Sequence, residues 1–216
     1  MITKITQTAW AIFLTLSMIV FVHPATVLAQ ANTQKISKNL VGRAEDMVKE
    51  IERARKQTDK TAKKYDQMFS QNSVKARQKA YKDLNKEIKK TEDRVKEVRK
   101  RAENMQKEAD KFFSEWSKGL TKIQDTELRG YSYSNMTDSR DRYGQVIEAG
   151  LKAGGLYGSF VTDLKNQVSY FALDMSDAAM AKLTKNREDT QQKAKAMFQS
   201  ADELTRTTKG YIASMK

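Results

Sequence analysis

Residues 74–123 read VKARQKAYKDLNKEIKKTEDRVKEVRKRAENMQKEADKFFSEWSKGLTKI, and their apolar and small side chains recur at alternating steps of three and four. The middle of this pattern consists of Leu84, Ile88, Thr91 and Val95. Such spacing places the side chains on one stripe of an α-helix, and a 3.5-residue period is typical of coiled coils. At about 1.5 Å per residue the helix would be roughly 75 Å long, so it needs partners along its stripe.

The amino-terminal residues have a different character. Lys4 is the only charge before an apolar run over residues 10–22, and small residues follow at Ala29 and Ala31. This order is typical of a secretory signal peptide, so we predict one over residues 1–31 and an exported protein, periplasmic or secreted. An uncleaved membrane anchor is the alternative, but the apolar run is shorter than the ~20 residues that span a membrane. The chain has no cysteine, which excludes a lipoprotein anchor and disulfides.

The mature chain would lack several residue types that catalysis uses. His23 and Pro24 are the only histidine and proline, and both lie inside the predicted signal peptide. Nucleophilic systems with histidine, zinc sites of the His/Cys kind and Glu-x-x-His di-metal sites are therefore excluded. The carboxylate pairs Glu92–Asp93 and Glu188–Asp189 are interpreted as surface charges. We expect no enzymatic activity, no cofactor, no metal and no small-molecule substrate.

The rest of the chain repeats the helical pattern three times. Ser73 and Ser176 are suited to cap helices, Gly130 is suited to end one, and residues 131–135 have the composition of a loop. The prediction is an all-α, elongated antiparallel four-helix bundle with coiled-coil-like heptad packing, forming one domain over residues 32–216. The predicted helices run over about 36–70, 74–128, 137–174 and 177–214.

Short connections make neighbouring helices antiparallel, so counting from each turn predicts which residues lie level. The tip of the first hairpin, roughly residues 61–81, should protrude as two helices, and three helices should continue at the Trp116 end. Counting also predicts a packing site in which Phe112 and Trp116 fit against Gly150 and Gly154, with glycine leaving room for the rings. The alternative for these glycines is a break in the third helix.

Positive charge is concentrated in the first hairpin. Residues 35–123 carry 26 Lys and Arg against 15 Asp and Glu, whereas the residues after 123 carry 13 against 12. A field of one sign attracts anionic partners, which makes the hairpin a candidate anion-binding surface. Its candidate residues are Lys60, Lys63, Lys64, Lys75, Lys79 and Lys82. The alternative is a solvated helix face whose lysines are partly balanced by acids.

Two segments carry a resemblance to a known family. They are Ser139-Arg140-Asp141-Arg142-Tyr143 and the segment Asp163 to Leu183, which contains DLKNQV, LDMS and AAMAKL. The chain resembles an uncharacterised family of exported bacterial helical proteins, catalogued as domain of unknown function 2959. It departs from the family at Ala172-Leu173, where relatives have Lys-His, and at the glycine cluster, which consists of Gly144, Gly150, Gly154, Gly155 and Gly158. The resemblance implies export and an elongated helical fold, and it brings no established activity.

These observations predict an exported, non-enzymatic structural or scaffold protein of the bacterial cell envelope. It would act by helical-bundle binding to a partner protein in the envelope or to itself. The alternative is that the basic hairpin binds an anionic surface, namely membrane lipid, an envelope polymer or nucleic acid. A continuous lysine stripe would favour the second function, and lysines neutralised by neighbouring acids would favour the first.

Overall fold

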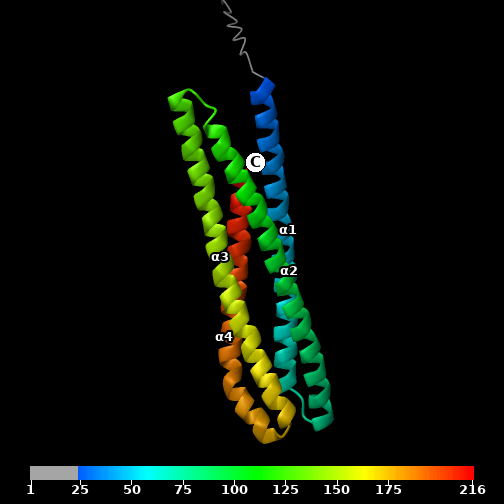
Figure 1. The fold of residues 1–216 in the computed structure, drawn as a ribbon. Coiled ribbons are helices and arrows are strands. Elements are labelled where there is room, and N and C mark those ends of the chain that lie inside the picture. Colours follow the sequence, from blue (N-terminus) through cyan, green and yellow to red (C-terminus); the bar gives the residue numbers. More distant parts are fainter. Residues whose placement is uncertain (1–23) are drawn as a thin grey trace, which may run out of the picture.

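Four helices make up residues 24–216, the part of the chain that the computed structural model describes (Figure 1). They are α1 (Pro24–Phe69), α2 (Val74–Leu120), α3 (Thr126–Leu173) and α4 (Asp177–Ser214). Each helix runs antiparallel to the next in one elongated bundle, which confirms the predicted fold class. The first 23 residues of the predicted signal peptide lie outside the described residues.

Serine caps begin two of the helices where the sequence predicts them. The hydroxyl of Ser73 accepts a hydrogen bond from the backbone N–H of Ala76 at 3.2 Å, at the start of α2. Ser176 accepts one from the N–H of Ala179, also at 3.2 Å, at the start of α4. Each bond satisfies a backbone donor that the first helical turn leaves free, which is why serine is favoured there.

The predicted boundary between the second and third helices was wrong. α2 ends at Leu120 rather than near 128, and α3 begins at Thr126 rather than near 137. Gly130 lies inside α3 without a left-handed conformation, and the predicted loop 131–135 is helical. The carboxylate of Asp125 caps α3 by accepting a hydrogen bond from the N–H of residue 128 at 2.9 Å. Because Asp is a strong N-cap residue, the helix begins before the polar segment rather than after it.

The earlier turn shifts α3 along α2 toward the first hairpin's tip. The ring of Phe171 lies 6.3 Å from that of Tyr81, whereas the predicted turn would have placed it near Thr91. The tip therefore does not protrude, and Tyr65 and Met68 within it are buried. That prediction was wrong because it depended on the position of the turn.

Three helices do continue at the opposite end, but they are α1, α2 and α3, whereas the predicted register left the first helix short of this end and continued the fourth. α4 ends at Ser214, and the sulfur of the next residue, Met215, lies 3.6 Å from the hydroxyl of Ser139 on α3. Figure 1 shows the α2–α3 connection and the start of α1 extending beyond the carboxyl terminus.

The apolar core consists of two clusters rather than one continuous seam. The cluster nearer the α2–α3 connection includes Leu40, Met105, Phe112, Val146 and Tyr211. The cluster nearer the α3–α4 connection includes Tyr65, Leu84, Phe160, Phe171 and Met197. The core of the bundle is therefore interrupted near its middle.

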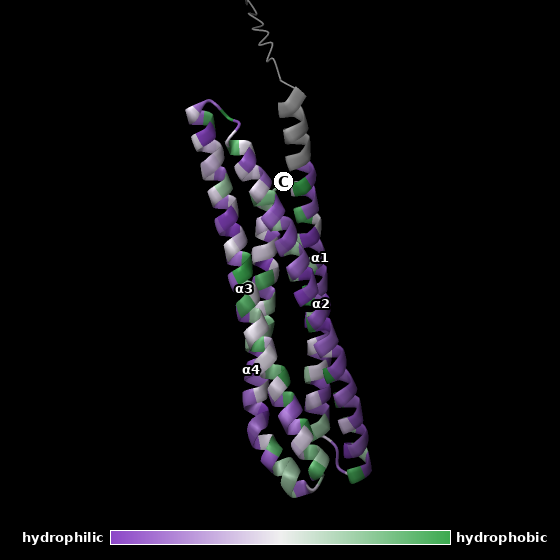
Figure 2. Ribbon diagram, in the orientation of Figure 1, coloured by the Kyte–Doolittle hydropathy of each residue, from purple (hydrophilic) through white to green (hydrophobic). Residues whose placement is uncertain are grey.

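Hydrophilic residues predominate along much of the bundle, with hydrophobic residues interspersed among them (Figure 2). Most of α2 is hydrophilic, and hydrophobic residues on α3 gather in the middle of the bundle and near the α3–α4 connection. In the described part of the chain, no helix combines the length and the apolar character that crossing a membrane requires.

Candidate functional site

A cleft of about 650 Å³ opens between the two helical hairpins, where the core is interrupted. All four helices line it. Buried side chains from every helix line its deeper part, among them Ile51, Met105, Val146 and Leu204. Half-buried and exposed residues of α2 and α3 line its walls nearer the solvent, and the exposed residues Arg99 and Leu151 lie at the mouth.

Gly150, Gly154 and Gly155 of the glycine cluster line this cleft, and none of them packs against an aromatic ring. A Cβ atom built on Gly154 would meet nothing within 4 Å, and one on Gly150 would meet only Leu204, at 3.9 Å. The predicted packing site was therefore wrong, since Phe112 and Trp116 lie near Ser214 and Met215, where α4 terminates. The physical reason is the earlier turn between α2 and α3, which changes the residues that lie level.

The absence of side chains on one wall explains why the core is interrupted. On the opposite wall, Val95, Val98 and Ala102 belong to the predicted heptad stripe but are only half-buried. Glycine offers them no side chain to pack against, so apolar surface stays open between the hairpins. α3 is continuous from Thr126 to Leu173, so the alternative of a break at the glycines was also wrong.

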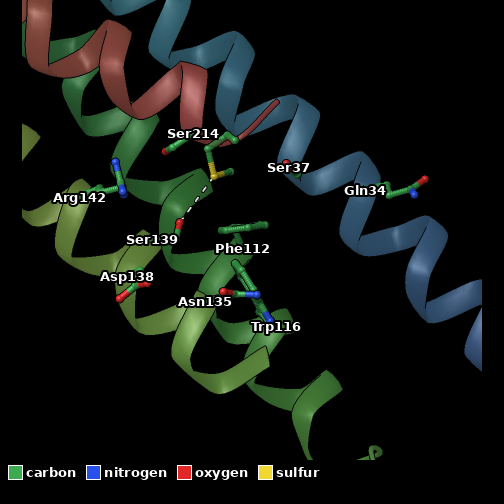
Figure 3. A pocket seen from close by; sticks show the side chains of 10 residues that line it. Gln34, Ser37, Phe112, Trp116, Asn135, Asp138, Ser139, Arg142 and Ser214 are labelled. Atoms are coloured by element: carbon green, nitrogen blue, oxygen red, sulfur yellow. Dashed lines mark hydrogen bonds between the residues drawn. The ribbon is translucent and has the colours of Figure 1, made fainter. Parts of the chain in front are cut away.

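A second pocket, of about 480 Å³, lies where α4 ends (Figure 3). Phe112 and Trp116 of α2 line it together with polar residues of α3, which include Asn135 and Arg142. The indole Nε1 of Trp116 donates a hydrogen bond to the hydroxyl of Ser132 at 3.1 Å. This pocket combines an aromatic wall with polar walls, in contrast to the apolar cleft.

Buried hydroxyl groups connect α1, α2 and α3 next to the cleft. The hydroxyls of Thr61 and Thr91 lie 2.8 Å apart, and those of Thr58 and Tyr157 lie 2.9 Å apart. Burial raises the pKa of Tyr157 to about 12. The tyrosine therefore stays neutral at physiological pH. The two hydroxyl–hydroxyl hydrogen bonds favour one register of the helices, because a slip would leave buried hydroxyls unpaired.

A buried carboxylate lies on the α1–α2 interface. Glu87 accepts a hydrogen bond from Gln57 at 2.8 Å and one from Lys90 at 2.9 Å, and the Lys60 ammonium lies 3.4 Å away. Burial disfavours the ionised form, but these three partners outweigh it and lower the pKa of Glu87 to about 2. The charge is thus held for structural reasons and is not poised for proton transfer near neutral pH.

The six candidate anion-binding lysines fall into two groups. On α1, Lys60 pairs with Glu87, Lys63 lies 2.6 Å from Asp59, and Lys64 donates a hydrogen bond to Gln67. These acceptors lie beside the α1 lysines and reduce their availability to an anionic partner.

The α2 lysines behave differently. They belong to an exposed stripe, on the side of α2 opposite the apolar seam, that consists of Lys75, Lys79, Lys82, Lys86 and Lys89. None of the five forms an ion pair with another residue of the described chain within 4 Å. A continuous basic stripe and neutralised lysines therefore both occur, on neighbouring helices.

The carboxylate pairs show no catalytic arrangement. Glu92 lies 3.0 Å from Lys165, and Asp189 lies 3.0 Å from Lys193, so both are engaged with lysines at the surface of the bundle. Within residues 24–216, no three His, Cys, Asp or Glu side chains are grouped so that they could hold a metal ion.

Arg77 is a structural residue that the sequence-based reasoning did not single out. It is 8% exposed, and its guanidinium donates to the backbone carbonyls of Gln71 at 3.1 Å and Met175 at 3.0 Å and pairs with Asp177. It thereby joins the α1–α2 connection to the α3–α4 connection. Its position on the apolar stripe, seven residues before Leu84, was the available signal.

Comparison with known proteins assigns the chain to a family. The family model described as "Protein of unknown function (DUF2959)" matches residues 31–215. The chain belongs to this family. Neither the curated proteins nor the solved structures contain a significant match.

The match confirms the resemblance and extends it beyond the segments that carried it. In this DUF2959 protein, Ala172 and Leu173 are both exposed at the end of α3. Both pockets and the lysine stripe lie within the matched residues.

Proposed function

We propose that this protein is an exported, non-enzymatic scaffold of the bacterial cell envelope that binds a partner protein at the end of α4. The observation that carries the proposal is the unequal length of the bundle there. α4 ends beside Ser139, while α1, α2 and α3 continue, so the fourth helical position of the bundle is open. Support for export comes from the charge-poor start, the apolar run and the small residues at Ala29 and Ala31.

The chemistry of the open position suits an amphipathic helix of the partner. Trp116 is half-buried there, and Leu128 and Tyr131 on α3 are 61% and 70% exposed. Leu128, Tyr131 and Asn135 are spaced by three and four, so they share one face of α3. Aromatic side chains with a polar rim are typical of protein interfaces, and a helix in a groove is a common mode of recognition.

Site-specific crosslinking tests this function. A photoreactive residue at Asn135 should capture a discrete envelope protein, whereas one at Thr162, which is exposed on α3 but outside the pocket, should not. The double variant Tyr131→Ala, Asn135→Arg should lose capture in a pull-down from a solubilised envelope fraction and keep its helicity. Undiminished capture by the double variant would refute this docking site.

The lysine stripe on α2 favours a second candidate function, which is binding to an anionic surface. Five lysines at steps of three and four present one sign of charge over residues 75–89, about 20 Å of helix at about 1.5 Å per residue. Such a stripe would attract phospholipid headgroups or polyanions. Exposed charges are screened at distances beyond about 10 Å in 0.1 M salt, so binding should fall steeply between roughly 0.05 and 0.3 M salt.

The two halves of the predicted lysine set provide matched variants for this test. Reversing Lys75, Lys79 and Lys82 to Glu should abolish flotation with anionic vesicles. Reversing Lys60, Lys63 and Lys64 changes the charge equally but affects lysines that already have local acceptors, so it should weaken flotation much less. The scaffold function predicts partner capture that survives both reversals and high salt. If both variants bound anionic vesicles and this binding did not change with salt, anionic-surface binding by the lysine stripe would be eliminated.

A further inference from the structure

The cleft between the hairpins has the dimensions and the surface of a small-molecule site. Its volume of about 650 Å³ lies within the range of roughly 300–1,000 Å³ that ligand pockets occupy. Two large apolar side chains at the cleft, Ile147 and Leu151, are 37% and 75% exposed. They belong to neither of the two buried clusters of the core. Apolar surface at a concave site is favourable to cover, at about 25 cal/mol per Å².

The sequence keeps the cleft open at a cost to the helix. Gly150, Gly154 and Gly155 line the cleft, and glycine inside a helix is destabilising by about 1 kcal/mol relative to alanine. No residue of the bundle requires glycine at position 154, because a Cβ there would meet nothing within 4 Å. Larger side chains would instead project into the cleft. The glycines are thus explained by the space that they leave.

The lining indicates a flexible hydrocarbon as the apolar body of the ligand. The walls carry Val95, Val98 and Ala102 from α2 and Val146 and Ile147 from α3, all of them aliphatic. No flat aromatic wall faces the middle of the cleft, since the lining tyrosines are the first and last lining residues of α3. Covering such aliphatic surface with a hydrocarbon chain removes it from water and is favourable.

The mouth of the cleft indicates a negative charge on the ligand. The exposed guanidinium of Arg99 lies there and is in an ion pair with no other residue of the described chain. The other lining arginine, Arg55, is engaged by Asp202 at 2.6 Å. Glu103 is the opposing charge at the mouth, and Lys100 adds positive charge beside Arg99.

We propose that this cleft binds a small amphipathic anion, with its hydrocarbon body against the glycine wall and its carboxylate or phosphate beside Arg99. This site is separate from the docking pocket at the end of α4. The proposal of a ligand in the cleft therefore does not depend on the proposal of a partner protein at that pocket. It adds a bound small molecule to a protein for which the sequence predicted no small-molecule substrate.

Calorimetric titration of the delipidated full chain with laurate, below the concentration at which laurate forms micelles, tests the proposal. Wild type should bind about one laurate per chain, and Gly154→Leu should reduce the affinity at least about tenfold by filling the cleft. Gly158→Leu is the matched control. A Cβ at Gly158 also meets nothing within 4 Å, but this glycine does not line the cleft, so binding should be unchanged. Thermal melting verifies that both variants are folded.

Headgroup variants identify the charge contact and the source of the anion. Arg99→Gln should weaken the binding of laurate and of dodecyl phosphate several-fold and leave that of dodecanol unchanged, because only the first two are anionic. Glu103→Gln should strengthen both anions. Whichever of laurate and dodecyl phosphate binds wild type more tightly identifies the headgroup as carboxylate or phosphate.

Three results would overturn the proposal. The first is the lack of saturable binding of any of these three probes by wild type. The second is equal affinity of Gly154→Leu and Gly158→Leu for laurate. The third is a dimer in solution that Gly154→Leu converts to monomer without laurate binding, which would assign the cleft to a second copy of the chain.

Discussion

The indole Nε1 of Trp116 on α2 donates a hydrogen bond to the Ser132 hydroxyl on α3, at 3.1 Å. This bond lies between one and two helical turns from the α2–α3 connection and reports the register between the two helices. The same register places the hydroxyl of Tyr157 on α3 at 3.3 Å from the carbonyl oxygen of Thr91 on α2, much farther from the α2–α3 connection. The cleft, the position of the glycines and the burial of the first hairpin's tip all follow from it.

Removing the acceptor of this bond should be measurable. We expect Ser132→Ala to lower the free energy of unfolding by about 1 kcal/mol, the usual net value of such a hydrogen bond. Urea denaturation measures it. Ser134→Ala, at an exposed position on the same turn, is the control and should change stability by less than about 0.5 kcal/mol. Equal stability of both variants would show that the bond contributes nothing.

Alanine at the cleft glycines should stabilise the bundle. Gly154→Ala restricts the unfolded chain, and its methyl group meets no atom within 4 Å. The expected gain is about 1 kcal/mol, seen as a rise in Tm of roughly 2–4 °C. Gly150→Ala should behave similarly, since its methyl group would reach Leu204 only at an ordinary contact distance of 3.9 Å. A lower Tm for both would mean that the hairpins lie closer together in solution.

Arg77 should contribute more to the free energy of unfolding than any exposed lysine of α2. Arg77→Ala removes the hydrogen bonds between the two connections, and we expect a loss of about 2 kcal/mol in the free energy of unfolding. Arg77→Lys should restore less than half of it, because an ammonium cannot reproduce the planar fork of the guanidinium. The exposed Lys79→Ala is the control. If lysine restored full stability, the bonds to the two backbone carbonyls would be unimportant.

The pH dependence of stability should contain a contribution from Glu87. Its pKa in the folded state is about 2, below its ordinary value of 4.5 in the unfolded chain. A lowered folded pKa stabilises the native state above pH 4.5, and this contribution is lost as the pH falls from 4.5 to about 2. We expect it to be about 2 kcal/mol, since solvent screens the exposed Lys60 and Lys90.

The variant Glu87→Gln isolates this contribution. The difference in unfolding free energy between wild type and variant should be largest at pH 7 and should shrink below pH 4.5. Urea denaturation at a series of pH values measures it. A difference that stays constant from pH 7 to pH 2.5 would contradict the assigned pKa.

Export should leave a defined amino terminus. We expect cleavage after Ala29 or Ala31, and intact-mass measurement of protein recovered from its native host decides between the two. Protein with a mass that still includes residues 1–29 would contradict the prediction of a cleaved signal peptide.

The turn between α1 and α2 and the buried face of α2 were predictable because their signals are local, whereas α1 begins at Pro24 rather than near 36 and α2 ends at Leu120 rather than near 128. The heptad stripe through Leu84 and Ile88 specifies a helix and its buried face, and Ser73 specifies where that helix begins. Local periodicity and capping act within a few residues, so they can be read from the chain itself. The family resemblance was readable for the same reason, from contiguous residues such as Ser139 to Tyr143.

The register between the hairpins was decided only in the tertiary structure. Asp125 and Gly130 were both acceptable boundary residues, and the choice between them moves every contact of α3 along α2. It is decided by which alignment buries Phe171 and Tyr65 together and satisfies the hydroxyls of Thr91 and Tyr157, all of them distant in sequence. For the same reason, the glycines pointed toward close packing in the sequence and line a cleft in the folded bundle: what a residue without a side chain does depends on what lies opposite it.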